Sequence, residues 1–160
     1  MNKKNTLLLF LCLFCLWAVA QEKKPVKIAC VGNSITYGSG IKNQFQNSYP
    51  GLLSQLLGEG YDVRNFGISA RVMLNKGDHP YMHEQKFRDL LAFQPDIVTI
   101  KLGTNDSKPW NWHYGKDFGK DLTEMLDILQ DLPSKPKIYL CFPVPAVKRN
   151  FGINDSVITN

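Results

Sequence analysis

Three short polar turns contain the residues of this sequence that could carry out chemistry. Each turn follows an apolar run and combines a glycine with small polar residues: Gly32-Asn33-Ser34, Gly67-Ile68-Ser69 and Gly103-Thr104-Asn105. A serine just past a strand, at the start of a helix, places a nucleophilic hydroxyl beside free backbone N–H groups. Taken alone, Asn33-Ser34 is more typical of an ordinary helix cap. The three turns together favour an active site, with Ser34 as the candidate nucleophile.

The elements between these turns alternate between strand and helix patterns. Apolar or alternating runs predict strands at 26–31, 61–66, 96–102 and 137–142. Apolar residues at helical spacing predict helices at 49–57, around 84–91 and at 117–132. The segments 38–47, 108–115 and 143–160 read as loops or show no clear period. This alternation favours an α/β fold with a parallel sheet covered on both faces, whose strand ends share one ligand-binding edge.

The first twenty residues read as a secretory signal peptide. Two lysines precede an apolar run at 7–17, which is short for a membrane span, and small residues follow at 18–20. The open alternative is an uncleaved anchor. We therefore expect a signal at 1–20, one domain at 21–160, a secreted or periplasmic location and no stable membrane insertion after cleavage.

Charge and cysteine content narrow the possible partners. Removing the two leader lysines lowers the formal net charge from +5 to +3, and no Lys/Arg block indicates nucleic acid or an acidic membrane as partner. Cys12 and Cys15 lie in the leader. Cys30 and Cys141 lie in apolar runs, so we expect small buried side chains rather than a disulfide. No cluster has metal-ligand spacing, and no metal or other cofactor is expected.

The three turns resemble the first conserved blocks of the SGNH, or GDSL-type, hydrolases. The matching stretches occur in the family's order and spacing: Gly32-Asn33-Ser34-Ile35-Thr36, Asn65-Phe66-Gly67 and Gly103-Thr104-Asn105-Asp106. The resemblance is closest to the sialate O-acetylesterase-like branch of secreted bacterial carbohydrate esterases, in which asparagine replaces the aspartate before the nucleophile. It implies a three-layer α/β/α sandwich with a parallel, flavodoxin-like sheet.

The resemblance also implies a role for one residue of each turn. Ser34 would be the nucleophile of a serine esterase, and its N–H, the N–H of Gly67 and the side-chain amide of Asn105 would form the oxyanion hole. Donors of this kind stabilise the negative charge that acyl transfer builds on the carbonyl oxygen. The implied reaction is hydrolysis of an O-acyl ester, most simply O-acetyl, on sialate or another acetylated sugar. Asp106 is expected to bond loop backbone instead.

The aromatic segment after the third block offers a binding surface for a glycan. Trp110, Trp112 and Tyr114 could stack on sugar rings, although packing within the loop is the commoner role of such side chains. Two other functions stay open on the sequence. One is a non-catalytic glycan-binding module or decayed fragment, and the other is a lipid or thioester hydrolase of the same fold.

The base that such a serine needs is missing from the recognisable motifs. The family carries it as a histidine in an Asp-x-x-His block near the C-terminus, and no such block follows Asn105. His79, His83 and His113 are placed elsewhere and are expected to have surface or packing roles. We therefore expect a C-terminally truncated hydrolase domain whose own activity is very weak, because an unactivated serine is a poor nucleophile.

Overall fold

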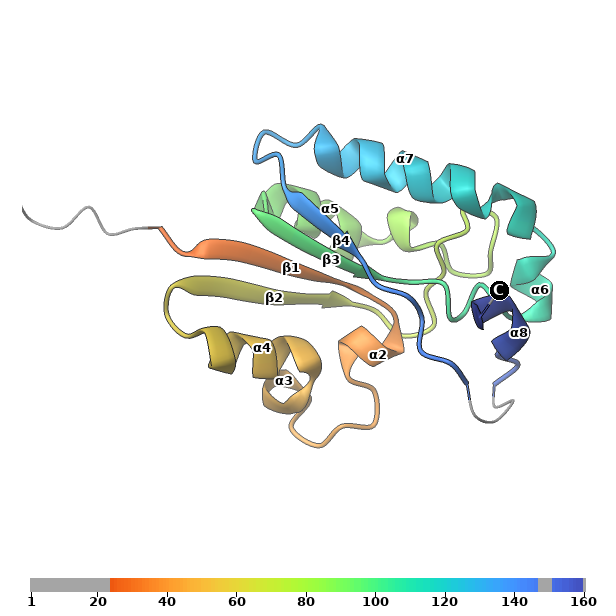
Figure 1. Cartoon of the computed structure of the whole chain (residues 1–160), viewed down its shortest axis with the longest axis horizontal. Coiled ribbons are helices and arrows are strands. Elements are labelled where there is room, and N and C mark those ends of the chain that lie inside the picture. Colours follow the sequence, from red (N-terminus) through yellow and green to blue (C-terminus); the bar gives the residue numbers. More distant parts are fainter. Residues whose placement is uncertain (1–23, 147–150, 160) are drawn as a thin grey trace, which may run out of the picture.

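The computed structural model describes residues 24–146 and 151–159, and its centre is a single parallel sheet (Figure 1). Its strands are β1 (Val26–Gly32), β2 (Tyr61–Gly67), β3 (Ile97–Lys101) and β4 (Lys137–Leu140). Neighbouring strands pair in the order β2-β1-β3-β4, all parallel. This order confirms the predicted flavodoxin-like sheet, in which the strand order reverses at β1 and opens a crevice beside β3.

The register of the sheet brings the three polar turns to one edge. Gly32 pairs with Gly67 on one side and with Lys101 on the other. Ser34, Gly67 and Asn105 therefore follow three adjacent strands at their carboxyl ends. This placement is the one that the sequence predicts from the shared strand-then-glycine pattern.

Helices cover both faces of the sheet, as Figure 1 shows. One layer consists of α5 (Gln85–Phe93) and α7 (Phe118–Gln130); the other consists of α4 (Tyr49–Leu57) with the short α2 (Ser34–Tyr37) and α3 (Gln44–Asn47). The main core lies under α5 and α7, where Phe87, Leu90, Met125 and Leu129 are buried with sheet residues such as Val98. These side chains recur on one face of each helix, which is why the pattern predicts both helices.

A smaller buried cluster joins α4 to the opposite face of the sheet. Tyr49 of α4 shares a hydrogen bond of 3.2 Å with Thr99 of β3, and burial raises the pKa of the Cys30 thiol and of the Tyr49 phenol. Cys30 is buried as expected. The expectation for Cys141 is wrong, because this residue follows β4 at the uncovered edge of the sheet and is exposed.

Several short helices occupy segments that the sequence predicts as loops or that show no clear period. They are α3, α6 (Pro109–Trp112), the 3₁₀ turn η2 (Gly115–Asp117) and α8 (Asp155–Thr159); a further turn, η1 (Tyr81–His83), precedes α5. The loop prediction is wrong for α3 and α6; the segment of α8 has no clear period, and no element is predicted there. A helix of three to five residues is too short to show a 3.6-residue hydrophobic period, so the sequence carries little signal for it.

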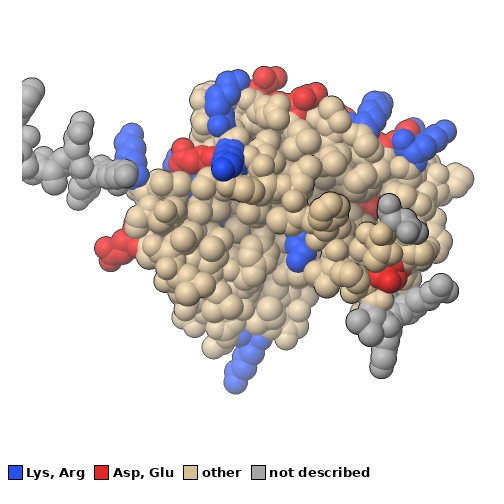
Figure 2. Space-filling model, viewed as in Figure 1, with Lys and Arg blue, Asp and Glu red and all other residues tan. Residues whose placement is uncertain are grey.

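The predicted signal at 1–20 lies outside the described residues. Within the described ranges, no helix has both the length and the apolar character needed to cross a membrane. Figure 2 shows basic and acidic side chains interspersed on the visible face, in keeping with the small net charge.

Candidate active site

Ser34 is the first residue of α2 and stands just beyond the end of β1. Asn33 caps this helix, since its Oδ1 accepts a hydrogen bond of 3.0 Å from the N–H of Ile35. A Cβ at Gly32 would lie 2.1 Å from Thr36 Oγ1, so glycine lets α2 fold back over the strand end. The cap is therefore the asparagine, and the serine is not needed for it.

Both reactive groups of Ser34 are free in the structure. Within residues 24–146 and 151–159, neither its hydroxyl nor its backbone N–H has a hydrogen-bond partner. The side chain is partly exposed at the sheet edge. A nucleophile and an oxyanion donor need these two groups to be available to a substrate.

Gly67 lies directly under α2. Its N–H donates to Asn65 Oδ1 at 2.9 Å, and Asn65 Nδ2 donates to the carbonyl of Thr36 at 3.0 Å. Asn65 thus ties the end of β2 to the helix that carries Ser34. The role predicted for the Gly67 N–H as an oxyanion donor stays a prediction, and it requires this N–H to be shared with or released by Asn65.

Gly67→Ala is expected to lower the free energy of unfolding by about 1–3 kcal/mol, the usual cost of overpacking. The new Cβ would lie 2.3 Å from the backbone nitrogen of Tyr37, which cannot rotate away. Urea unfolding measures the effect, with Gly60→Ala as the control because a Cβ there meets nothing within 4 Å. Equal midpoints for the two variants would mean that α2 does not rest on Gly67.

Asn105 is held by both its side chain and its backbone. Its Nδ2 donates to the carbonyl of Arg71 at 3.1 Å, and its own carbonyl accepts from Asn111 Nδ2 at 3.0 Å. Arg71 is fixed in turn by an ion pair of 2.8 Å with Glu84. Since a carboxamide has two N–H donors, one positions the Asn105 side chain and the second remains for a substrate oxygen.

Asp106 has the structural role expected of it. Its carboxylate is buried and accepts from the N–H groups of Met73 and Leu74, both at 2.8 Å. Buried Asn111 completes the support, since its Oδ1 accepts from the N–H of Asp78 at 2.9 Å. Sequence reasoning missed Asn111, which lies in the segment predicted as an aromatic loop and carries no motif.

The stability of the protein should depend on pH through Asp106. Burial raises the pKa of this carboxyl, although the two backbone N–H bonds oppose the rise. The folded state then binds the proton more tightly than the unfolded chain, so the free energy of unfolding falls as pH rises from the unfolded pKa through the folded pKa. We expect Asp106→Asn to flatten this part of the pH profile while keeping an acceptor oxygen.

Asp106→Ala supplies the matched comparison. It leaves two buried N–H groups without an acceptor, and at ~1–3 kcal/mol for each group it should destabilise the fold by roughly 2–6 kcal/mol. Urea unfolding of both variants across acidic to neutral pH measures the two effects. Equal stability of the alanine and asparagine variants would contradict the role of the carboxylate as an acceptor.

The three predicted sugar-stacking side chains lie beside the third block. Trp110 is 55% exposed, and its indole N–H donates to Asp78 at 3.1 Å. Trp112 packs against Phe118 with ring centroids 6.0 Å apart, while Tyr114 is partly buried. Trp110 presents the most open ring of the three. The platform stays a prediction.

The three histidines, His79, His83 and His113, lie at exposed positions away from hydrogen-bond contact with Ser34. Among the residues that the structure describes, no group of His, Cys, Asp and Glu side chains is arranged to hold a metal ion.

Comparison with known proteins identifies the family. Residues 30–158 match the model of the GDSL-like Lipase/Acylhydrolase family. A relative from Xylanibacter ruminicola, named acetylxylan esterase, is 50% identical over 88% of this chain. The chain spans about a third of the length of that relative, 33%.

Solved structures share the fold. Est24, a carbohydrate acetylesterase from Sinorhizobium meliloti, matches with a TM-score of 0.58 and 21% identity over 75% of this chain and 65% of its own. AlinE4, an SGNH-hydrolase family esterase, matches with a TM-score of 0.58 and 22% identity over 84% and 67% of the two chains. At these identities the likeness concerns the fold. The family model matches residues 30–158, which are most of this chain, so the chain belongs to the GDSL-like lipase/acylhydrolase family.

Proposed function

We propose that this chain hydrolyses O-acetyl esters on a carbohydrate, with Ser34 as the nucleophile. The observation that carries the proposal is the free hydroxyl and N–H of Ser34 at the carboxyl edge of β1, between the turns of Gly67 and Asn105. The hydroxyl oxygen attacks the ester carbonyl and loses its proton, and the sugar leaves as an alcohol that takes up a proton. Water then hydrolyses the acetyl-serine, which releases acetate and restores the hydroxyl.

The negative charge of the two tetrahedral intermediates needs fixed donors. The N–H of Ser34 and the second amide N–H of Asn105 are the available candidates, and Gly67 adds a third if Asn65 yields its hydrogen bond. Donors held in place before the reaction stabilise this charge without the cost of reorganisation. The Arg71 carbonyl contributes by fixing the Asn105 amide.

The choice of a carbohydrate ester follows the names of similar proteins. The relative that is 50% identical is named for acetylxylan, and Est24 is a carbohydrate acetylesterase. Acetylated xylan is therefore the first substrate to test. Acetylated sialate is the second, and a long-chain acyl ester represents the lipid or thioester alternative.

A second candidate function is glycan binding without catalysis. It is favoured by the absence, within the described ranges, of a histidine hydrogen-bonded to Ser34. Added imidazole separates the two functions, because it can take the serine proton from solution. Esterase function predicts that imidazole accelerates acetate release from acetylated xylan in the native chain more than in Ser34→Ala. Equal acceleration in the two proteins would favour glycan binding alone.

The same assay ranks the substrates. The rate of acetate release from acetylated xylan and from acetylated sialate is compared with the rate of acid release from a long-chain acyl ester. The rate measured with Ser34→Ala is subtracted in each case. We expect the acetylated carbohydrates to be hydrolysed faster. A faster Ser34-dependent reaction with the long-chain ester would reject the carbohydrate assignment.

A further inference from the structure

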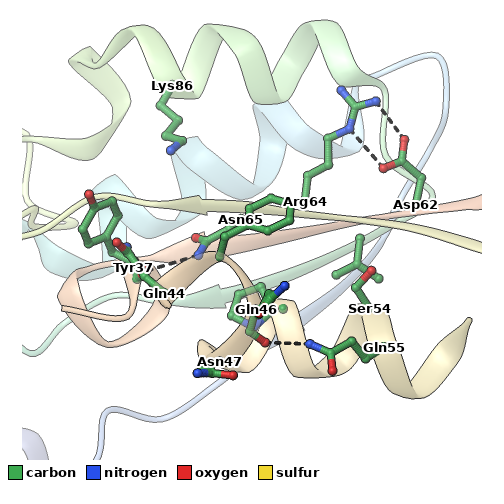
Figure 3. A pocket seen from close by; sticks show the side chains of 14 residues that line it. Tyr37, Gln44, Gln46, Asn47, Ser54, Gln55, Asp62, Arg64, Asn65 and Lys86 are labelled. Carbon is green, nitrogen blue, oxygen red and sulfur yellow. Dashed lines mark hydrogen bonds and ion pairs between the residues drawn. The ribbon is translucent and has the colours of Figure 1, made fainter. Parts of the chain in front are cut away.

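A groove of about 940 Å³ follows the outer edge of β2 (Figure 3). One wall consists of α3 and α4, and the other contains Lys86 of α5. The strand contributes residues 62–65, and one end of the groove is lined by Tyr37. Tyr37 is the last residue of α2 and Ser34 is its first, so the groove begins about one helical turn from the proposed nucleophile.

Side-chain amides form much of the helical wall. Gln44, Asn47 and Gln55 each donate an amide N–H to the main-chain carbonyl of a nearby residue, with lengths of 2.7 Å for Asn47 and 2.8 Å for Gln55. These bonds fix the amide planes. In the described part of the chain, the carbonyl oxygens of the three side chains accept no hydrogen bond. The wall therefore presents three positioned acceptors, which suit a ligand with several hydroxyl donors.

An exposed aromatic ring lies next to these acceptors. Phe45 of α3 is 93% exposed, and Tyr37 is 39% exposed. The backbone of α3 is fixed against α4, since a Cβ at Gly51 would lie only 2.3 Å from the carbonyl oxygen of Phe45. An apolar ring on a fixed helix backbone, beside hydroxyl acceptors, matches a sugar, which has a C–H face and a rim of hydroxyls.

The charged side chains that line the groove are few, and two of the three are paired with each other. Arg64 and Asp62 neutralise each other in an ion pair of 2.8 Å. Lys86 is the one charged lining side chain without an ion pair in the described residues. The outer edge of β2 could also pair with an extended peptide. The acceptor oxygens and the ring lie on the helical wall instead, where a strand added to β2 would not use them.

We propose that this groove binds the polysaccharide chain that carries the ester, starting about one helical turn from Ser34, which attacks the acetyl group. This proposal rests on the proposed function. It assigns substrate recognition to α3 and α4, away from the aromatic residues that follow the third block. Polymer length then contributes to affinity, while a small acetyl ester reaches Ser34 without using the groove.

The experiment titrates the full chain with unacetylated xylo-oligosaccharides of increasing length by calorimetry. Affinity should rise with length, and Phe45→Ala should weaken it about tenfold, which corresponds to ~1.4 kcal/mol. Phe45→Trp keeps an aromatic ring and should retain binding. Leu56→Ala is the matched control, because Leu56 is 83% exposed on α4 but does not line the groove. Circular dichroism verifies that each variant is folded.

Turnover distinguishes this proposal from the proposed function. Phe45→Ala should lower kcat/KM for acetylated xylan about tenfold relative to kcat/KM for a small acetyl ester. If hydrolysis depends on Ser34 but Phe45→Ala and Leu56→Ala have the same kcat/KM for acetylated xylan, the groove does not bind the substrate chain. The proposed esterase function would be unaffected by that result. Phe45-dependent binding without Ser34-dependent acetate release would overturn the assignment to a substrate chain. Tighter binding of an extended peptide than of the oligosaccharides would assign the groove to strand addition.

Discussion

Ser34→Ala is expected to abolish the rapid first release of alcohol from an activated acetyl ester. The native chain should release about one equivalent per molecule as Ser34 becomes acetylated, because the activated leaving group makes acylation of the serine faster than hydrolysis of the acetyl-serine. The alanine variant has no oxygen to acylate. Stopped-flow absorbance measures the amplitude of this phase.

Ser39→Ala is the matched control for this result. Ser39 follows the same short helix, and its hydroxyl shares a hydrogen bond of 2.7 Å with Ser69. This variant should keep the full amplitude. A burst that survives in Ser34→Ala, or disappears in Ser39→Ala alone, would contradict the assignment of the nucleophile.

Asn105→Ala should slow acylation of Ser34 by about 10²–10³-fold, or ~2.7–4 kcal/mol, which is typical for the loss of one oxyanion donor. The reason is that the free amide N–H of Asn105 would contact the oxyanion only as charge develops. The rate constant of the burst phase measures the effect, and kcat and kcat/KM should fall together.

A slower acylation caused by lost stability must be separated from one caused by the loss of an oxyanion donor. The variant also loses the hydrogen bond to the Arg71 carbonyl, which is worth about 1 kcal/mol of stability. Asn75→Ala is a suitable control, because it removes an amide that donates to exposed Glu124 at 3.0 Å and not to the backbone that positions Asn105. If both variants slow acylation equally, Asn105 does not act on the oxyanion.

The sheet and the long helices could be predicted because their residues bury one face. Leucines in α4 and the spacing of Phe87 and Leu90 in α5 give a helical period, and the runs before Gly32 and Gly67 give strands. The turn glycines also mark the carboxyl ends of the strands, and in a parallel sheet these ends lie together at one edge. The fold class and the position of Ser34 follow from these features.

Other parts of the site depend on contacts that sequence patterns do not encode. The bond between the Gly67 N–H and Asn65 Oδ1, and the support of Asn105 by Asn111, join side chains to backbone two and six residues away. No periodicity or spacing specifies such a bond. Phe45 lies in a segment predicted as a loop, because α3 is too short to show a hydrophobic period. The groove along β2 was therefore not predictable.

The most direct test of the account is to locate the acetyl group on the protein. The full chain is incubated with an activated acetyl ester, quenched in acid during the slow phase and digested, and mass spectrometry then identifies the modified peptide. A single acetyl group is expected on the hydroxyl of Ser34, present in Ser39→Ala and absent from Ser34→Ala. Acetylation confined to lysines or to another serine, with Ser34 unmodified, would contradict it.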